Sequence, residues 1–217
     1  MNLHGENLIP GNRYHNFKNF ISFPNVGTPE LEYPRYPALP VDGLTFDKSL
    51  MAMIAKQDYL ISTPYQTYDY VIHFLREAAI DPKVKEISIA VYRLAENSRI
   101  MHALINAAKN GKKVNCLVEL RARFDEQNNI TWSTRLEEEG VNVIYGIDGY
   151  KVHSKICLVR RMDKEKDTYY ACLSTGNYNE KTARMYADHT LLTANKKLPL
   201  IWLKFLKLLI KEFYLKG

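Results

Sequence analysis

Cysteine and long hydrophobic runs are scarce in this 217-residue sequence. The three cysteines, Cys116, Cys157 and Cys172, are far apart and lie among apolar residues. This pattern is typical of buried thiols in a reducing cytosol and argues against a zinc site or a disulfide framework. No apolar run has the length of a transmembrane helix, and the first residues lack the basic and apolar segments of a signal peptide. We therefore expect a soluble, cytoplasmic protein.

Acidic residues are outnumbered by basic ones, 24 against 30, which gives a net charge of +6. A modest positive balance weakly favours an anionic partner, and a solubilising surface explains it equally well. The hydrophobic content of 46% and the charged content of 25% are ordinary for a globular domain. Composition alone therefore leaves the partner open, and the placement of the charges has to decide.

Proline is rare after the first 45 residues, which contain six of the nine prolines. Because proline fixes φ and has no amide hydrogen, this segment is predicted to be extended or looped. An irregular opening of such length is uncommon in a compact domain. We interpret residues 1–45 as the tail of a missing N-terminal domain and residues 46–217 as the main domain.

From residue 46 the hydrophobic pattern becomes regular. Strand and helix patterns alternate in the middle of the chain, which predicts an α/β fold with helices flanking a mostly parallel sheet. Strand patterns without helices between them follow at the end, so we expect a mixed sheet. The predicted strands are 59–62, 87–92, 114–120, 141–145, 152–159, 169–174 and 190–193, with a turn at 162–167. The predicted helices are 46–56, 70–79, 100–108, 125–140 and 200–215, with Ser98 as an N-cap and Gly111 as a C-terminal stop.

A histidine lies between two lysines in the run KVHSK at 151–155. In a strand, alternation would place Lys151, His153 and Lys155 on one face. Lysine supplies positive charge to phosphoryl oxygens, and nearby cations disfavour the imidazolium form, which keeps an imidazole nitrogen free to attack. The alternative for the triplet alone is a strand-edge histidine between solvated lysines. We hypothesise that His153 is the nucleophile of a phosphoryl-transfer site.

The segment Ser174–Asn179 follows a predicted strand and is rich in small and amide residues. Its backbone amides and the side chains of Asn177 and Asn179 can hold an oxyanion. Alone, such a segment is more often a plain turn. Its position after the strand that follows His153 makes it a candidate partner of that residue.

His153 and Lys155 on one strand, with this loop after the next, resemble the phospholipase D-like superfamily, which uses the histidine as a covalent phosphoryl carrier. The superfamily's usual aspartate after the lysine is absent because Arg160 stands there, which argues against phospholipase or nuclease activity. A closer resemblance is to the bacterial polyphosphate kinases of the ATP-dependent, phosphohistidine type, over about residues 11–195. The segments that carry it are 14–20, 23–27, 92–93, 98–100, 110–114, 118–126, 153–155 and 175–184.

This resemblance implies roles for individual residues. His153 matches the autophosphorylated histidine, and Tyr186 matches a nucleotide-contacting tyrosine. Arg93 and Arg123 match two arginines that the family places with magnesium and phosphates. Because arginine cannot itself bind a cation, we interpret both as clamps on phosphate oxygens that magnesium also touches.

Further candidates rest on physical grounds. Lys155, Asn177 and Asn179 are expected to bind phosphate. Arg99 lies at a predicted helix start, where anions gather, although an exposed helix arginine explains it equally well. Asp188 is a candidate to orient an imidazole, with a turn cap as the alternative.

The activity that the resemblance implies is reversible transfer of the terminal phosphate of ATP to inorganic polyphosphate, with Mg²⁺ as cofactor. The expected partners are ATP or ADP, polyphosphate and the missing N-terminal and C-terminal domains of the same enzyme, without nucleic acid. The domain at 46–217 would be one phospholipase D-like catalytic half, inactive in isolation, within a homo-oligomer that is cytoplasmic or peripheral to the inner membrane. Two alternatives stay open: a phospholipase D-like phosphodiesterase acting as a homodimer, and a non-catalytic module that binds polyanions.

Overall fold

The computed structural model describes residues 11, 17, 20, 23–24, 27, 29–31, 33–34, 36–119, 126–146 and 151–195. The chain divides into two compact units, Met1–Pro37 and Ala38–Gly217. In the first unit, the described residues include the 3-10 turn η3 (Pro29–Leu31). The assignment of residues 1–45 to a preceding domain stays a prediction. The predicted helix at 200–215 lies outside the described residues.

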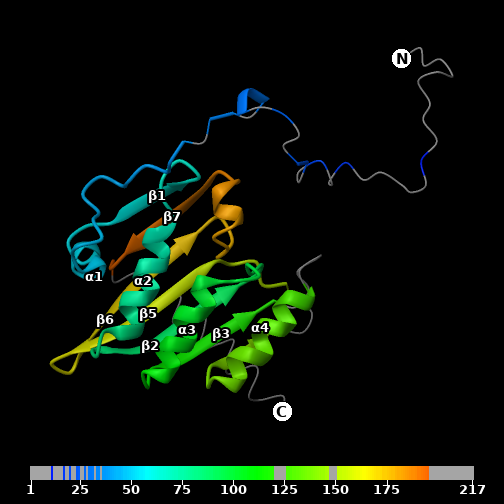
Figure 1. The fold of residues 1–217 in the computed structure, drawn as a ribbon. Coiled ribbons are helices and arrows are strands. Elements are labelled where there is room, and N and C mark those ends of the chain that lie inside the picture. The colour runs from blue at the N-terminus through cyan, green and yellow to red at the C-terminus, as the bar shows by residue number, and fades with distance from the viewer. Residues whose placement is uncertain are drawn as a thin grey trace. The chain divides into compact units, whose positions relative to one another are not determined.

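The second unit is an α/β fold in which helices and strands alternate before a run of strands (Figure 1). No helix in the described part of the chain has the length and hydrophobicity of a membrane span. The helices are α1 (Leu50–Ile54), α2 (Asp69–Ile80), α3 (Arg99–Lys109) and α4 (Glu126–Glu138), with the 3-10 turn η4 (Thr182–Arg184). The strands are β1 (Tyr59–Thr63), β2 (Val84–Val91), β3 (Lys113–Val118), β4 (Asn142–Tyr145), β5 (Ile156–Asp163), β6 (Lys166–Ser174) and β7 (Asp188–Thr193).

The seven strands form one sheet in the order β1-β7-β6-β5-β2-β3-β4. The pairs β2–β3 and β3–β4 are parallel, and the other four pairs are antiparallel. The prediction of a mixed sheet is confirmed. The expectation of a mostly parallel one is wrong for the neighbouring pairs. Parallel neighbours need a crossover connection, and among adjacent strands only β2, β3 and β4 are joined in this way, through α3 and α4. Helix α2 also joins β1 to β2, but three other strands lie between those two in the sheet.

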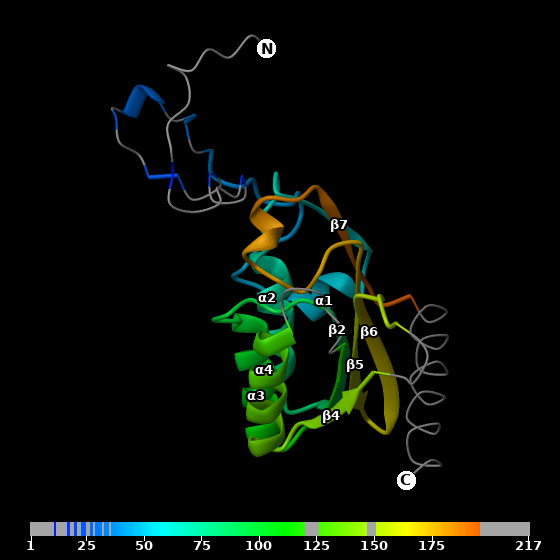
Figure 2. The same cartoon turned by 90° about the vertical axis from the view of Figure 1, so that its right-hand side faces the viewer.

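The helices α2, α3 and α4 lie together on one face of the sheet (Figure 2). Between them and the sheet lies the main core, whose fully buried side chains include Tyr70, Phe74, Ile89, Leu104 and Tyr178. A smaller apolar cluster lies on the opposite face. It consists of Ala90, Leu117, Ile144, Val152, Leu158 and Ala171, with Ile156, Tyr169 and Leu173 packed against it.

Capping residues explain where the central helices begin and end. Ser98 is the N-cap of α3, and its Oγ accepts a hydrogen bond of 3.3 Å from the amide of Met101. Gly111 follows α3 with φ at +75°, the left-handed conformation that glycine adopts without strain. Helix α2 ends at Ile80, and its C-cap Asp81 has the extended backbone that a residue before proline favours. The predictions of Ser98 as an N-cap and of Gly111 as a C-terminal stop are confirmed.

Two predicted elements are longer than those that form. The helix predicted at 46–56 is reduced to α1, and the strand predicted at 152–159 begins only at Ile156. Before that residue the chain bonds locally, because Lys155 Nζ donates a 2.7 Å hydrogen bond to the carbonyl oxygen of His153. The segment 151–155 therefore approaches the sheet without joining it.

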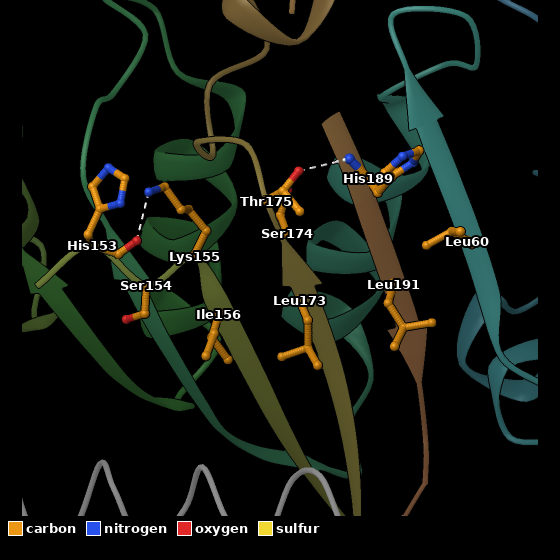
Figure 3. Close-up of a pocket in the computed structure, with 10 residues that line it drawn as sticks. All are labelled: Leu60, His153, Ser154, Lys155, Ile156, Leu173, Ser174, Thr175, His189 and Leu191. Carbon is orange, nitrogen blue, oxygen red and sulfur yellow. Dashed lines mark hydrogen bonds between the residues drawn. The ribbon is translucent and has the colours of Figure 1, made fainter. Parts of the chain in front are cut away.

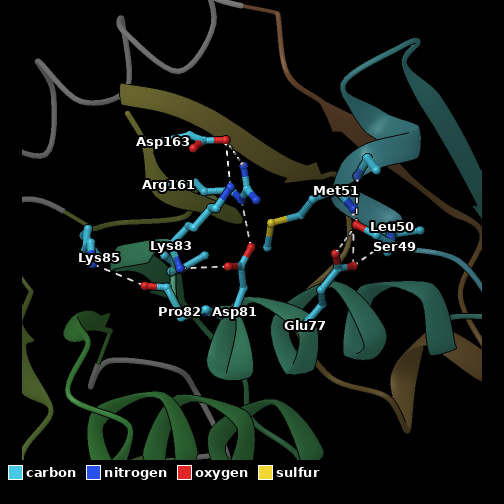
Figure 4. Close-up of polar contacts among 12 residues, drawn as sticks. Ser49, Leu50, Met51, Glu77, Asp81, Pro82, Lys83, Lys85, Arg161 and Asp163 are labelled. Atoms are coloured by element: carbon cyan, nitrogen blue, oxygen red, sulfur yellow. Dashed lines mark hydrogen bonds and ion pairs between the residues drawn. The ribbon is translucent and has the colours of Figure 1, made fainter. Parts of the chain in front are cut away.

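Charged groups connect the end of α2 to β5 at the sheet edge opposite the start of β5 (Figure 4). Arg161 Nε lies 2.8 Å from Asp81 Oδ2, and Lys83 Nζ lies 2.9 Å from Asp163 Oδ2. Partial burial opposes ionisation of Asp81, but the hydrogen bonds from Arg161 and from the amide of Lys83 outweigh it and lower the pKa of Asp81. These contacts fix the long β5–β6 hairpin to the helical layer.

The three cysteines lie buried in the sheet, and all are free thiols. Cys157 and Cys172 face each other on β5 and β6, and Cys116 is separated from Cys157 by Ile89 of β2. Burial raises the pKa of Cys116 and of Cys172 to about 12, and it raises the pKa of Cys157 well above its usual value. The prediction that these cysteines are buried free thiols is confirmed.

Candidate active site

The predicted site residues gather at one edge of the sheet. Because β5 runs antiparallel to both β2 and β6, the ends of β2 and β6 and the start of β5 lie at the same edge. The residues 92–93 follow β2, the residues 151–155 precede β5, and the residues 175–179 follow β6. The fold thus brings together segments that are distant in the sequence.

The ring of Tyr92 is the centre of this edge. The imidazole of His153 meets it edge-on, with ring centroids 4.8 Å apart and an interplanar angle of 80°. The Nζ atoms of Lys151 and Lys155 lie 5.2 Å and 5.3 Å from the Tyr92 centroid, and Arg93 Cζ lies 5.8 Å from it. One buried aromatic ring therefore holds three cations around the histidine through cation–π attraction.

The predicted grouping of Lys151, His153 and Lys155 is thus present, although its expected cause is not. These residues precede β5, so strand alternation does not apply to them. Their shared contact with Tyr92 brings them together instead.

The environment of His153 favours its neutral form. Partial burial lowers the pKa of His153 below its usual value, and the positive charges of Lys155, Lys151 and Arg93 lower it further. Because only the neutral imidazole has a free nitrogen lone pair, His153 is available as a nucleophile at neutral pH.

Lys155 combines burial with positive charge. Its side chain is 5% exposed, and burial and Arg93 lower the pKa of Lys155 while Asp188 opposes them. Its Nζ is directed to the edge by the hydrogen bond to the carbonyl oxygen of His153. The Lys155 ammonium is therefore held beside the imidazole, where it can meet an anion bound to His153.

A cavity of about 530 Å³ opens beside His153 on the sheet face opposite the helices (Figure 3). The polar side chains of His153, Lys155, Thr175 and His189 lie along one side of it. A row of apolar side chains lies along the other side, one from each of four neighbouring strands: Ile156, Leu173, Leu191 and Leu60. The cavity thus offers a charged rim next to an apolar floor.

The loop after β6 is held tightly against β7. Thr175 Oγ1 donates a 2.7 Å hydrogen bond to Asp188 Oδ1 and accepts one of 3.0 Å from the amide of His189. A Cβ atom at Gly176 would lie only 2.8 Å from Asp188 Cβ, so only glycine fits there. The Asp188 carboxylate therefore orders this loop, which corresponds to the turn-capping alternative for that residue.

The two asparagines of the loop differ in their contacts. Asn179 is 7% exposed, and its Oδ1 accepts hydrogen bonds of 3.0 Å from the amides of Lys181 and Thr182, so its carbonyl group caps η4. The buried Oδ1 of Asn177 has no hydrogen-bond partner among the described residues. Because buried polar atoms are normally satisfied, Asn177 is the better candidate for a ligand contact.

The remaining predicted residues are Arg99, Tyr186 and Arg123. Arg99 Nη1 lies 2.8 Å from Asp69 Oδ1, and Arg99 lines a separate cavity of about 260 Å³. Tyr186 follows η4 and is 59% exposed. Arg123 lies outside the described residues. Sequence reasoning did not select Tyr92, and the available signal was an aromatic residue at the end of a buried strand, directly before Arg93.

The pKa of His153 gives a direct prediction. Replacing Lys151 with methionine removes one positive charge beside the imidazole, so we expect the pKa of His153 to rise towards 6.5. The measurement is a pH titration of the His153 ring protons by NMR. The matched control is Lys109→Met on α3, where the lysine pairs with Glu139 and should leave the titration unchanged. An unchanged His153 midpoint in Lys151→Met would contradict the electrostatic explanation.

Comparisons with known proteins agree on one family. Residues 49–212 match the family model described as "Polyphosphate kinase C-terminal domain 1". The chain is 47% identical over 195 residues to a polyphosphate kinase of Vibrio vulnificus strain YJ016. This alignment covers 90% of the chain and 28% of that relative. It resembles the crystal structure of polyphosphate kinase from Porphyromonas gingivalis with a TM-score of 0.77 and 43% identity, over 94% of this chain and 34% of the other.

A more distant likeness concerns the fold alone. Nuc from Salmonella typhimurium, a phospholipase D family member, matches with a TM-score of 0.56 and 16% identity, over 73% of this chain and 94% of that protein. The phospholipase D-like fold is therefore confirmed. The match over residues 49–212 shows that this chain belongs to the polyphosphate kinase C-terminal domain 1 family.

Proposed function

We propose that this chain is part of an enzyme that reversibly transfers the terminal phosphate of ATP to inorganic polyphosphate through a phosphohistidine at His153. The observation that carries the proposal is the grouping of His153 with Lys151, Lys155 and Arg93 around Tyr92. A neutral imidazole nucleophile surrounded by cations suits attack on a highly charged phosphate. The family match supports the same chemistry.

The transfer takes place in two displacements. An imidazole nitrogen of His153 forms a bond to the γ-phosphorus, and the bond from that phosphorus to the bridging oxygen breaks as ADP leaves. A terminal oxygen of polyphosphate then attacks the phosphohistidine, the N–P bond breaks, and the chain grows by one phosphate. Lys151, Lys155 and Arg93 stabilise the negative charge that the transferring oxygens carry in both steps.

Magnesium fits the described residues only through its substrate. No group of three or more histidine, cysteine, aspartate or glutamate residues suited to a metal lies within the described ranges. Arg93 has no lone pair for a cation. When bound, Mg²⁺ would neutralise phosphate oxygens, and proteins commonly hold this ion partly through substrate phosphates.

The chain spans 28% of the relative it matches, so the assay needs a longer protein. We define the chimera as the Vibrio vulnificus relative in which only the residues that align with residues 49–195 of this chain are replaced by those residues. Incubated with γ-³²P-ATP and polyphosphate, the chimera should transfer label to polyphosphate, as seen by thin-layer chromatography. The 217-residue chain alone is expected to give little or no synthesis, because it has a single His-x-Lys motif. Failure of the chimera, beside an active unmodified relative, would count against the proposal.

The same samples test the two alternatives. Hydrolysis of a phosphodiester substrate by a dimer of the chain would support the phosphodiesterase alternative. The observation in favour of this alternative is the likeness between the fold of this chain and that of Nuc. Arg160 does not supply the acidic group of that superfamily and instead lies 3.2 Å from Asp167 Oδ1. Salt-sensitive binding of polyphosphate without turnover in the chimera would support a polyanion-binding module.

Arg93 should act on phosphate binding more than on stability. Removing a charge-assisted contact with phosphate should weaken ATP binding to the chimera by roughly tenfold to a hundredfold in Arg93→Ala. Because Arg93 is only half-buried at the sheet edge, the melting temperature should change by a few degrees at most. Binding is measured by calorimetry and melting by circular dichroism. Arg123→Ala is expected to behave in the same way.

The matched control is Arg135→Ala on α4. Arg135 also lies over an aromatic ring, with its Cζ 5.2 Å from the centroid of Trp132. It lies in the last turn of α4, outside the segments that form the site, and has no predicted role. This variant should bind ATP normally. If Arg93→Ala unfolds while its folded fraction binds ATP normally, the residue is structural.

A further inference from the structure

The segment that carries His153 is held by few backbone contacts. Residues 151–155 form neither helix nor strand, and regular pairing with β2 and β6 begins at Ile156. The amide of Val152, directly before the histidine, donates a 2.9 Å hydrogen bond to Glu119 Oε2. A side chain from the end of β3 therefore fixes the backbone next to His153.

Glu119 is itself firmly placed. It is 2% exposed, and its amide continues the pairing with β2 through a 3.2 Å hydrogen bond to the carbonyl oxygen of Val91. Its own carbonyl oxygen accepts a 3.1 Å hydrogen bond from Asn129 Nδ2, which also donates at 2.8 Å to the carbonyl oxygen of Tyr92. Asn129 on α4 thus links Glu119 to the residue whose ring contacts His153.

We propose that Glu119 is a positioning residue for His153. By accepting the hydrogen bond from the amide of Val152, Glu119 fixes the position of the imidazole at the sheet edge. This inference rests on the proposed function. Nucleophilic attack requires the reacting atoms to approach to about 3–3.5 Å in line, and a displacement of about 1 Å costs up to a hundredfold in rate. Tyr92 guides the ring of His153 from one side, and Glu119 fixes the backbone beneath it.

The role as an acceptor makes specific demands on substitutions. Glu119→Gln keeps an oxygen at the same distance along the side chain and can still accept from Val152. Glu119→Met has a similar length without a strong acceptor, and Glu119→Asp keeps the carboxylate but withdraws it by one methylene group. The matched control is Glu138→Met on the exposed side of α4.

The test compares these variants in the chimera with ATP and polyphosphate. Glu119→Met and Glu119→Asp should lower kcat at least tenfold while the KM for ATP stays within about twofold, because the phosphate-binding cations remain. Glu119→Gln and Glu138→Met should stay within about threefold of the parent kcat. A purely structural role would lower the amount of folded enzyme and leave kcat per folded molecule unchanged.

A second measurement needs neither ATP nor the rest of the enzyme. Phosphoramidate transfers its phosphoryl group to an imidazole nitrogen as the P–N bond to its own nitrogen breaks and ammonia leaves. Mass spectrometry of the 217-residue chain gives the rate at His153, and NMR hydrogen exchange gives the protection of the Val152 amide. In Glu119→Met the phosphorylation rate of His153 should fall, and the Val152 amide should exchange at least tenfold faster. In Glu119→Gln both the rate and the exchange should stay as in the parent chain.

The outcomes separate this inference from the proposed function. If the parent chimera forms no phosphohistidine, the proposed function fails whatever the Glu119 variants do. If it does form, and Glu119→Met reacts at the parent rate, only the positioning role is overturned. A fall in Glu119→Gln as large as that in Glu119→Met would also overturn it, because charge and not the hydrogen bond would then matter. If Glu119→Met does not fold, Glu119→Asp decides.

Discussion

Incubation of the chimera with γ-³²P-ATP and magnesium should label the protein on His153, and His153→Ala should reduce the label below detection. Phosphate bound to an imidazole nitrogen is lost in acid and survives base, so both treatments identify the linkage. The neutral form of His153 is favoured by partial burial and by the three neighbouring cations, and its nitrogen attacks without a separate base. Of the two histidines that line the described cavity, His153 is the one in contact with Tyr92 and its cluster of positive charge.

His189→Ala is the matched control for this experiment. His189 lines the same cavity, but its Nδ1 is hydrogen-bonded at 3.0 Å to Ser62 Oγ, at the far end of the polar side. This variant should keep the acid-labile label. An undiminished label in His153→Ala would place the nucleophile elsewhere in the enzyme and remove the basis of the proposed mechanism.

Tyr92→Leu should lower the rate of His153 phosphorylation by roughly thirtyfold to a hundredfold. The substitution removes the ring that attracts Lys151, Lys155 and Arg93. A cation–π contact contributes about 0.5–1 kcal/mol at an exposed site such as Lys151 and about 2 kcal/mol when desolvated, as at buried Lys155. Without the ring, mutual repulsion should spread the three cations away from the imidazole. Tyr92→Phe keeps the aromatic face and should stay within a few-fold of the parent rate, measured by rapid-quench labelling.

Loss of packing needs a separate control, because Tyr92 is 6% exposed. Tyr170 on β6 is equally buried, at 5% exposed, but it packs in the main core and lies opposite Val159, away from the start of β5. Tyr170→Leu should lower the melting temperature and leave phosphorylation of the folded protein unchanged. Equal rate losses in the two leucine variants would indicate a general effect on folding.

Local patterns were sufficient to predict most of the fold. The apolar spacing within α2 and α3 and the capping group of Ser98 are properties of short segments, so their boundaries could be read directly. The position of β5 between β2 and β6 depends on contacts between distant segments, so the number of antiparallel pairs could not be predicted. The prediction placed the start of β5 at Val152 instead of Ile156, also because contacts between distant segments decide it. Glu119 and Lys155 bond to backbone groups of Val152 and His153 that an extended strand would use.

The site shows the same division. Lys151, His153 and Lys155 are close in the sequence, so a phosphate site could be proposed from them, but the triplet alone fits a strand-edge histidine between solvated lysines as well. The central place of Tyr92 follows from the antiparallel pairing of β2 with β5, which no local pattern indicates. For Asn179, the nearby amides of Lys181 and Thr182 compete for its carbonyl group, a contact that composition does not reveal.

The buried thiols have a practical consequence for spectroscopy. Since Cys116, Cys157 and Cys172 are fully buried and hardly ionised, a maleimide dye should react with a cysteine introduced at exposed Lys166 while the native thiols stay intact. Lys166 begins β6, at the opposite end of the β5–β6 hairpin from the start of β5, roughly 25 Å along the strand. A fluorophore there would report binding and assembly of the folded chain without contacting His153. The three native cysteines would not have to be replaced first.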